Sequence, residues 1–151
     1  MSLQIIIKNF NELTLNELYE LLQLRTEIFV VEQNCVYQDI DNNDQKALHI
    51  LGYLNEKIVA YTRIFKVGDY ANFASIGRVV VDENYRKYGY GIAIMNASIQ
   101  AVYTQFGKQP ITISAQCYLY RFYTSLGFVQ ASKEYLEDGI PHIRMNKMYQ
   151  E

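Results

Sequence analysis

The spacing of apolar residues along the chain predicts two main helices and a set of short strands. From Tyr90 onward these residues recur at intervals of three and four, which predicts a helix over 91–106. Residues 14–17 (TLNE) match a capping box and predict a second helix over 15–29. The apolar stripes are Leu15, Leu18, Leu22 and Phe29 in the 15–29 helix, and Ile92, Met95, Ile99, Val102 and Phe106 in the 91–106 helix. The predicted strands are 5–7, 47–54, 58–65, 73–81, 111–115, 128–131 and 140–147, with a short helix over 118–126.

The order of these elements predicts a mixed α/β (α+β) fold. A chain of 151 residues suits a single domain over 1–151. Strands 73–81 and 111–115 flank a helix, so we expect them to run parallel in a right-handed crossover. The polar stretch 32–46 has no period of its own, and a connection this long is typically functional or contains a helix that the pattern does not reveal.

Composition and charge narrow the class of protein. Apolar residues make up 50% of the chain and charged residues 20%, which is ordinary for a globular protein. The net charge of −2 argues against nucleic acid or an anionic membrane as the main partner. No apolar run reaches transmembrane length. The start of the chain has no signal-peptide pattern and Cys35 and Cys117 have no paired spacing, so we expect a reduced, cytoplasmic protein.

The segment 78–91, RVVVDENYRKYGYG, leads from a valine-rich strand into the 91–106 helix. Glycines at a helix start let backbone N–H groups approach an anion such as phosphate, which the helix dipole favours. Two nucleotide-binding patterns do not match. The P-loop of NTPases needs a lysine after its last glycine, which is absent here, and the dinucleotide fingerprint needs a third glycine where this chain has Ile94. The pattern [QR]-x-x-G-x-[GA] fits from Arg86 to Gly91. The alternative is that Gly89 and Gly91 only form a tight turn.

The context of this loop resembles the GNAT family of N-acetyltransferases. The loop follows the valine-rich stretch 77–81, and one helix and one strand later the chain reads FYTSLGF (122–128). More specifically, the chain is similar to the ElaA-like subgroup of that family. The similarity lies in LRTEIFVVEQNCVYQDID (24–41), His49, AQCYLYRFY (115–123) and YLEDGIPHIRM (135–145), and spans 24–145.

The resemblance implies the GNAT fold and acetyl-CoA as co-substrate. That fold has a mixed central sheet of six to seven strands flanked by helices, with splayed parallel strands at the cofactor site. The amides of 86–92 are implied to hold the pyrophosphate, while the backbone edge of 79–81 pairs with the pantetheine arm. The implied cofactor-binding residues are Val79, Val80, Val81, Arg86, Lys87, Tyr88, Gly89, Tyr90, Gly91, Ile92, Gln116 and Tyr123.

The implied reaction is direct transfer of an acetyl group from the CoA thioester to an amine. The family's general acid corresponds to Tyr123, which would protonate the leaving thiolate. A backbone amide of Val79 or Val81 would stabilise the oxyanion. Many relatives carry a basic glutamate on the fourth strand, but residues 74–78 (ASIGR) hold no carboxylate.

The general base therefore stays open between three residues and water alone, which is enough to deprotonate an amine of modest pKa. Glu32, His49 and His142 are the candidates, and each has a structural alternative: a cap or salt bridge for Glu32, and a core position for either histidine. Residues of the 24–46 region and two strand arginines are candidates to contact the acceptor: Arg25, Glu27, Glu32, Gln33, Arg63 and Arg78.

The expected partner is a small-molecule or peptide amine, with no nucleic acid and no membrane, and a homodimer stays open. We expect no metal, because the sixth position of a calcium loop starting at Asp39 is Asp44 rather than glycine. One alternative is a non-catalytic acyl-CoA-binding module, which needs neither Tyr123 nor an acceptor pocket. Another is an acyl-homoserine-lactone synthase, a class that shares the fold and uses acyl-carrier proteins and S-adenosylmethionine. The short, acidic chain has no obvious basic patch for an acyl carrier.

Overall fold

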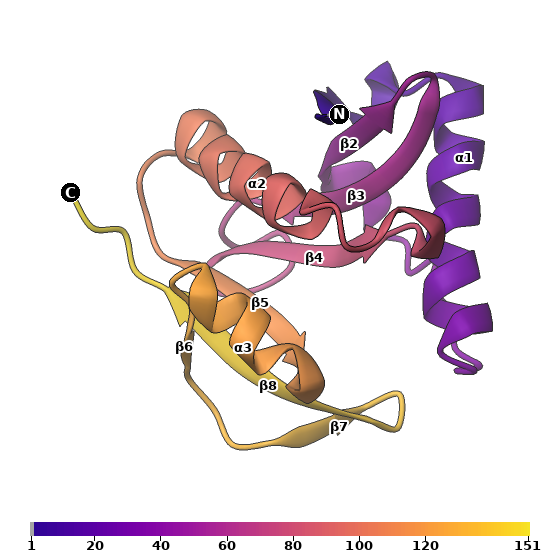
Figure 1. Cartoon of the computed structure of the whole chain (residues 1–151). Helices are drawn as coiled ribbons and strands as arrows, with labels where there is room; N and C mark the ends of the chain where they lie inside the picture. The colour runs from indigo at the N-terminus through magenta and orange to yellow at the C-terminus, as the bar shows by residue number, and fades with distance from the viewer. Residues whose placement is uncertain (1) are drawn as a thin grey trace.

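The computed structural model describes residues 2–151, whose strands form one mixed sheet (Figure 1). Within these residues the sheet has eight strands in the order β1-β2-β3-β4-β5-β8-β6, with β7 paired to β8. The strands are β1 Gln4–Asn9, β2 Leu48–Leu54, β3 Lys57–Phe65, β4 Ala74–Val81, β5 Ile111–Gln116, β6 Val129–Gln130, β7 Tyr135–Glu137 and β8 Ile140–Lys147. The mixed α/β prediction is confirmed. The sheet exceeds the six to seven predicted strands because β7, only three residues long, lacks a sequence pattern.

Helices cover both faces of the sheet. They are α1 Leu15–Thr26, α2 Tyr90–Phe106 and α3 Tyr120–Ser125, and α1 continues as a π-helical segment over Glu27–Glu32. Ile50 and Ala60 pack in the cluster that contains α2, whereas the next residues along the strands, Leu51 and Tyr61, pack in the cluster that contains α1. Because neighbouring strand residues face opposite sides, α1 lies on one face of the sheet and α2 on the other. Figure 1 shows α2 and α3 together in front of the sheet.

The start of α1 follows the prediction, and its buried stripe does so in part, because Leu18, Leu22 and Phe29 pack partly buried against the core. Thr14 caps the helix, with Oγ1 accepting from Glu17 N at 3.0 Å while the Glu17 carboxylate accepts from Thr14 N. Leu15, predicted to lie on the stripe, is 87% exposed. The buried face instead consists of Leu21, Leu24, Arg25 and Ile28. These residues follow the helical spacing i, i+3, i+4, i+7. The third of them is an arginine, so a search for apolar residues alone does not detect this buried stripe.

The sheet forks between β4 and β5. These strands are parallel, as predicted, but pair only at Ala74 with Ile111 and at Ser75 with Thr112. Beyond that point β4 contains a bulge: its register against β3 steps from Arg63–Gly77 to Tyr61–Val80, which leaves one extra residue. Arg78, within the bulge, has a φ of +49°. Bulges bend a strand and end its pairing, so β4 turns away from β5 as Figure 1 shows.

A network of three arginines and three aspartates, buried except for the partly exposed Arg78 and Asp41, holds this region together. The arginines come from α1, β3 and β4, and the aspartates all come from the polar stretch 32–46. The pairs are Arg25 Nε–Asp39 Oδ2 (2.9 Å), Arg25 Nη1–Asp44 Oδ1 (2.7 Å), Arg63 Nη2–Asp41 Oδ2 (2.6 Å), Arg63 Nη1–Asp44 Oδ1 (2.8 Å) and Arg78 Nε–Asp39 Oδ1 (2.7 Å). The charges balance, which is the condition under which ions are tolerated in an interior.

Two expectations from the sequence are wrong here. Arg25 and Arg63 are buried in the network, so neither is available to contact an acceptor. His49 is fully buried beside it: Nε2 donates to the Asp44 carbonyl at 2.9 Å, and Nδ1 accepts from the Tyr61 hydroxyl at 2.7 Å. Burial lowers the pKa of His49, and both ring nitrogens are occupied. His49 is therefore a core histidine rather than a general base.

The network predicts that Asp44→Asn is strongly destabilising. The change weakens both arginine contacts at once and leaves buried positive charge uncompensated, a loss of about 3–5 kcal/mol in the free energy of unfolding. Urea denaturation at pH 7 measures it. Asp69→Asn is the matched control, since the Asp69 side chain has no ion pair in residues 2–151, and its effect should stay within about 0.5 kcal/mol.

The same network predicts a dependence on acid. Burial alone raises the pKa of Asp44, but hydrogen bonds and charges from Arg25 and Arg63 outweigh it and leave the pKa below its ordinary value. A carboxyl with a depressed folded pKa stabilises fully above the unfolded pKa of about 3.9 and loses that contribution as the pH falls. The stability gap between the parent and Asp44→Asn should therefore shrink towards acid. A gap that is small at neutral pH, or constant with pH, contradicts this role.

Candidate functional site

A cavity of about 510 Å³ occupies the fork between β4 and β5. It is lined on the α2 side by the glycine loop, the start of α2 and Tyr123 of α3. On the α1 side it is lined by Gln33, Cys35 and Tyr37, and by Glu137 and Asp138 at the turn between β7 and β8. The cavity thus passes through the sheet at the point where the two strands separate.

The glycine loop has the geometry expected of an anion site. Gly89 is the N-cap of α2 with a φ of +79°, a conformation that favours glycine. The Ala93 N–H donates to the Gly89 carbonyl at 3.0 Å, so the first turn of α2 starts directly at the glycine loop and the N-terminal end of the helix lies there. A Cβ on Gly91 would lie 3.4 Å from the ring of Phe122, so this glycine lets α2 approach α3. The loop therefore forms a tight turn and also exposes the positive end of the helix dipole to the cavity.

Arg86, the first residue of the loop motif, is held by a carboxylate from the other wall. Its Nη1 and Nη2 contact Glu32 Oε2 and Oε1 at 2.6 and 2.7 Å, and its Nε and Nη2 donate to the Val81 carbonyl at 3.3 Å. The hydrogen bond from Arg86 lowers the pKa of Glu32. Of the two sequence-level alternatives for Glu32, the salt bridge is the one present here.

Tyr123 is placed deep in the cavity by α3. The side chain is 5% exposed and its ring packs edge-on against Phe122 and Phe128, with centroids 5.0 and 6.1 Å apart. Burial, followed by the nearby Tyr118, raises the pKa of the Tyr123 hydroxyl above its ordinary value. The phenol is therefore protonated throughout the neutral range and can act as a proton donor.

The opposite side of the fork carries a polar group from three strands. Ser114 Oγ and Tyr135 Oη lie 2.5 Å apart, and Ser114 Oγ donates to Glu137 Oε1 at 3.3 Å. The second carboxylate oxygen of Glu137 lies 3.4 Å from His142 Nε2. Ser114, Glu137 and His142 all line the cavity.

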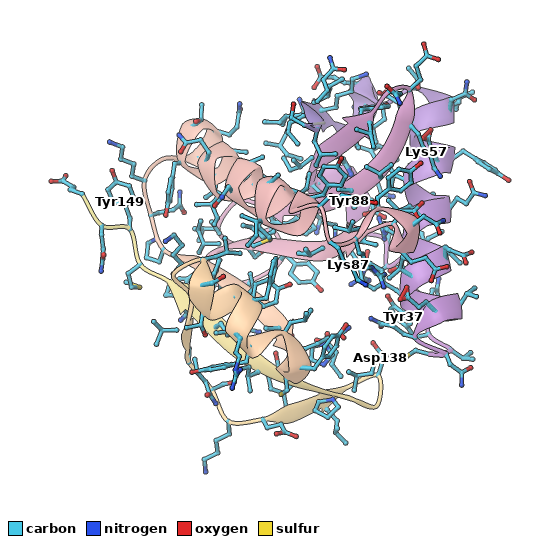
Figure 2. All side chains as sticks on the ribbon, in the orientation of Figure 1. Tyr37, Lys57, Lys87, Tyr88, Asp138 and Tyr149 are labelled. Carbon is cyan, nitrogen blue, oxygen red and sulfur yellow. The ribbon has the colours of Figure 1, made fainter. Side chains whose placement is uncertain are left out.

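Two bridges join the loop after the π-helical segment to this side. Gln33 and Gln116 exchange side-chain hydrogen bonds at 3.4 and 3.3 Å, and the Cys35 thiol donates to the Asp138 carbonyl at 3.4 Å. Cys35 and Cys117 are both free thiols. Figure 2 shows the labelled Tyr37 and Asp138 at the same end of the molecule, near the β7–β8 turn.

Most of the residues that the resemblance implied lie around the cavity. Tyr88 is the exception, being largely exposed outside the lining and packed near Tyr90. Among the base candidates, Glu32 and His142 line the cavity and His49 does not. The implied residues that line it are Val79, Val80, Val81, Arg86, Lys87, Gly89, Tyr90, Gly91, Ile92, Gln116 and Tyr123.

Sequence reasoning missed Ser114 and Glu137. Ser114 is the polar residue between Ile113 and Ala115 of β5, and this alternation is a usable signal for a side chain on the opposite face. Glu137 lies at the end of β7, a strand of three residues that has no pattern in the sequence, so no local signal indicates its position.

Neither a metal cluster nor a membrane helix occurs in the described chain. Across residues 2–151, no three His, Cys, Asp or Glu side chains are grouped so as to hold a metal ion. No helix in this part of the chain has the length and apolarity needed to cross a bilayer.

The forked sheet and its cavity define the class of protein as an acyl-CoA N-acyltransferase fold. The structure superposes on the crystal structure of an acyl-CoA N-acyltransferase from Pseudomonas aeruginosa with a TM-score of 0.91 and 40% identity, covering 97% of this chain and 99% of that one. It superposes on Escherichia coli ElaA with a TM-score of 0.89 and 41% identity, covering 96% and 99%.

Sequence comparison gives the family. A model described as an acetyltransferase (GNAT) domain matches residues 16–149. Protein ElaA of Escherichia coli (strain K12) is 44% identical over 137 residues, which is 89% of this chain and 90% of that protein. The chain belongs to the GNAT acetyltransferase family, in its ElaA-like subgroup, as the sequence predicted.

The Glu32–Arg86 pair predicts that Glu32→Gln strengthens anion binding at the loop. Without the carboxylate, Arg86 is free to meet an anion, and exposed ion pairs of this kind are worth about 0.2–1 kcal/mol, or roughly a one-and-a-half- to fivefold gain. Calorimetric titration with inorganic pyrophosphate at low salt measures it. Glu83→Gln is the control, because it removes the same charge near Arg86 without a bidentate contact. Equal affinities in all three proteins, or equal gains in both variants, contradict the prediction.

Proposed function

We propose that the protein is an acetyl-CoA-dependent N-acetyltransferase that moves the acetyl group directly from the thioester to an amine. The observation that carries this is the cavity at the β4–β5 fork, which joins the glycine loop to the buried hydroxyl of Tyr123. Membership of the GNAT family supports acyl transfer from an acyl-CoA. We propose in addition that the acyl group is acetyl and that the acceptor is an amine.

The cofactor is proposed to lie along the fork. Its pyrophosphate would meet the N–H groups at the start of α2, with Arg86 and Lys87 supplying positive charge. The pantetheine arm would follow β4 where that strand no longer pairs with β5, since unpaired backbone groups there need partners. The thioester would then lie near Tyr123, with the amide of Val79 or Val81 donating to the oxyanion.

The proposed chemistry assigns one proton transfer to Tyr123. The neutral amine attacks the thioester carbonyl, the carbon–sulfur bond of the tetrahedral intermediate breaks, and the thiolate leaves. Tyr123 then gives its hydroxyl proton to the sulfur and regains one from the product side. Burial raises the pKa of the Tyr123 hydroxyl, so this group carries its proton at neutral pH before the reaction starts.

The cofactor position predicts that Gly89→Glu abolishes acetyl-CoA binding. The substitution adds a bulky negative charge where the pyrophosphate is proposed to lie and strains a position with φ of +79°. Calorimetric titration with acetyl-CoA measures the loss. Gly68→Glu is the matched control: its φ is +90°, a Cβ there also meets nothing within 4 Å, and it lies outside the cavity lining. The proposal is overturned if the parent protein does not bind acetyl-CoA, or if the two variants bind it equally well.

The acid role predicts that Tyr123→Phe lowers kcat by roughly 100-fold or more while acetyl-CoA affinity changes little. Tyr120→Phe, on the same helix but outside the cavity lining, should leave kcat unchanged. The deficit should persist to about pH 9, because a phenol whose pKa exceeds 10 does not lose its proton below that value. Steady-state rates of CoA release measure this. Acetyl transfer at the parent rate by Tyr123→Phe removes the assignment, and acetyl-CoA binding without any transfer favours the non-catalytic module.

A further inference from the structure

His142, Glu137 and Ser114 form a connected group of polar side chains in the wall of the cavity. His142 lies on β8 opposite Gln116 of β5, and alternation along β8 separates it from Ile143, which packs in the core beneath α2 and α3. His142 therefore faces the α1 side of the fork, whereas Tyr123 reaches the cavity from the α3 side. The two side chains approach the same cavity from opposite faces of the sheet.

The hydrogen bonds of His142 determine which ring nitrogen can accept a proton. Nδ1 lies 2.7 Å from the Ile140 carbonyl, and because a carbonyl only accepts, Nδ1 must carry the hydrogen. In the neutral ring Nε2 is then the basic nitrogen. His49, in contrast, has both nitrogens occupied in the core.

The carboxylate of Glu137 is placed to stabilise a proton on that nitrogen. Oε2 lies 3.4 Å from His142 Nε2, and Oε1 accepts from Ser114 Oγ, which also contacts the Tyr135 hydroxyl. The rings of Tyr135 and His142 are stacked with centroids 6.1 Å apart, which fixes the imidazole plane. Glu137 is the charged group within contact distance of the ring in residues 2–151. When His142 gains a proton, the positive charge of its imidazolium ring is therefore balanced by the Glu137 carboxylate.

From this geometry we infer that His142 is the general base of the reaction, an inference that rests on the proposed function. The acceptor enters from the α1 side as an ammonium ion and gives one proton to His142 Nε2. The freed lone pair attacks the thioester carbonyl from that side, and sulfur leaves towards Tyr123. After the attack the amine nitrogen of the acceptor loses a second proton, which replaces the proton that Tyr123 has given to the thiolate. The first proton, held on His142, passes to solvent.

The carboxylates on this side also select the acceptor. Glu137 and Asp138 line this side of the cavity, and the Glu137 side chain is 50% exposed. These two carboxylates favour an acceptor amine that arrives as an ammonium ion. Alkylamines and peptide N-termini arrive in this form, and they need a base before they can attack. A base is dispensable only for an amine that is already neutral.

The test uses two amines of different basicity and the variant His142→Asn. The asparagine amide keeps a donor for the Ile140 carbonyl but removes the basic nitrogen. With butylamine, which is protonated at neutral pH, kcat/KM should fall by roughly 100-fold or more. With methoxyamine, which is largely neutral, the variant should retain close to the parent rate. A purely structural role for His142 would slow both amines alike.

Controls separate the outcomes. Acetyl-CoA titration of His142→Asn should match the parent, and Glu137→Gln should give a smaller loss with the same dependence on amine basicity. Transfer by the parent protein with equal losses for both amines in His142→Asn, or no loss for either, overturns the role of His142 alone. Absence of transfer by the parent to either amine, despite binding of acetyl-CoA, overturns the proposed function as well.

If His142→Asn fails to fold, a second measurement takes its place. Long-range nitrogen–proton NMR spectra of the parent protein report the tautomer of each of its two histidines. We expect His142 in the Nδ1–H form and His49 in the Nε2–H form. An Nε2–H tautomer for His142 would overturn the inference, because the basic nitrogen would then be Nδ1, which lies against the Ile140 carbonyl.

Discussion

The site depends on the buried ion network of Arg25, Arg63 and Arg78 with the aspartates of the 39–44 stretch. Ions are costly in an interior unless they are fully paired, and here three positive and three negative charges meet. The network ties α1, β3 and β4 to one long connection. Asp39 also accepts from the Tyr37 hydroxyl at 2.7 Å, so the network fixes a residue of the cavity wall. A polar segment whose regular structure is one short 3-10 helix, Asp44–Lys46, is thereby given a defined position beside the fork.

The fork itself is linked to this network through Arg78. That residue occupies the bulge of β4 with a positive φ, a conformation that costs energy for a residue with a side chain. Its guanidinium is held by Asp39 Oδ1 at 2.7 Å and by the Asp39 carbonyl at 2.9 Å. The same contacts that bury the charge therefore stabilise the backbone shape that parts β4 from β5. Structural stability and the opening for a ligand arise from one set of interactions.

How far the sequence predicted this protein depends on the range of each interaction. The glycine loop and Tyr123 lie in short motifs, and the helix cap at Thr14 is set by residues three apart, so these were readable locally. The ion network joins residues 14 to 39 positions apart, and an arginine on a helix is usually solvated, so Arg25 gave no sign of its burial. The same holds for Glu137 and His142, whose relation to Ser114 follows from the register of β5, β7 and β8. The sequence does not distinguish the two candidate histidines, because His49 and His142 both lie in predicted strands. Their hydrogen-bond partners in the folded protein distinguish them.

Amide hydrogen exchange with and without acetyl-CoA tests the central claim most directly, namely that the β4–β5 fork receives the cofactor. With acetyl-CoA at about 100 times its Kd, bound-state protection should slow exchange by roughly 100-fold wherever the ligand must leave first. We expect this slowing at the amides of 79–81 and in the first turn of α2, and not at β1, which lies at the far edge of the sheet. Protection confined to other surfaces, or no change at the fork while the ligand is bound, would contradict the account.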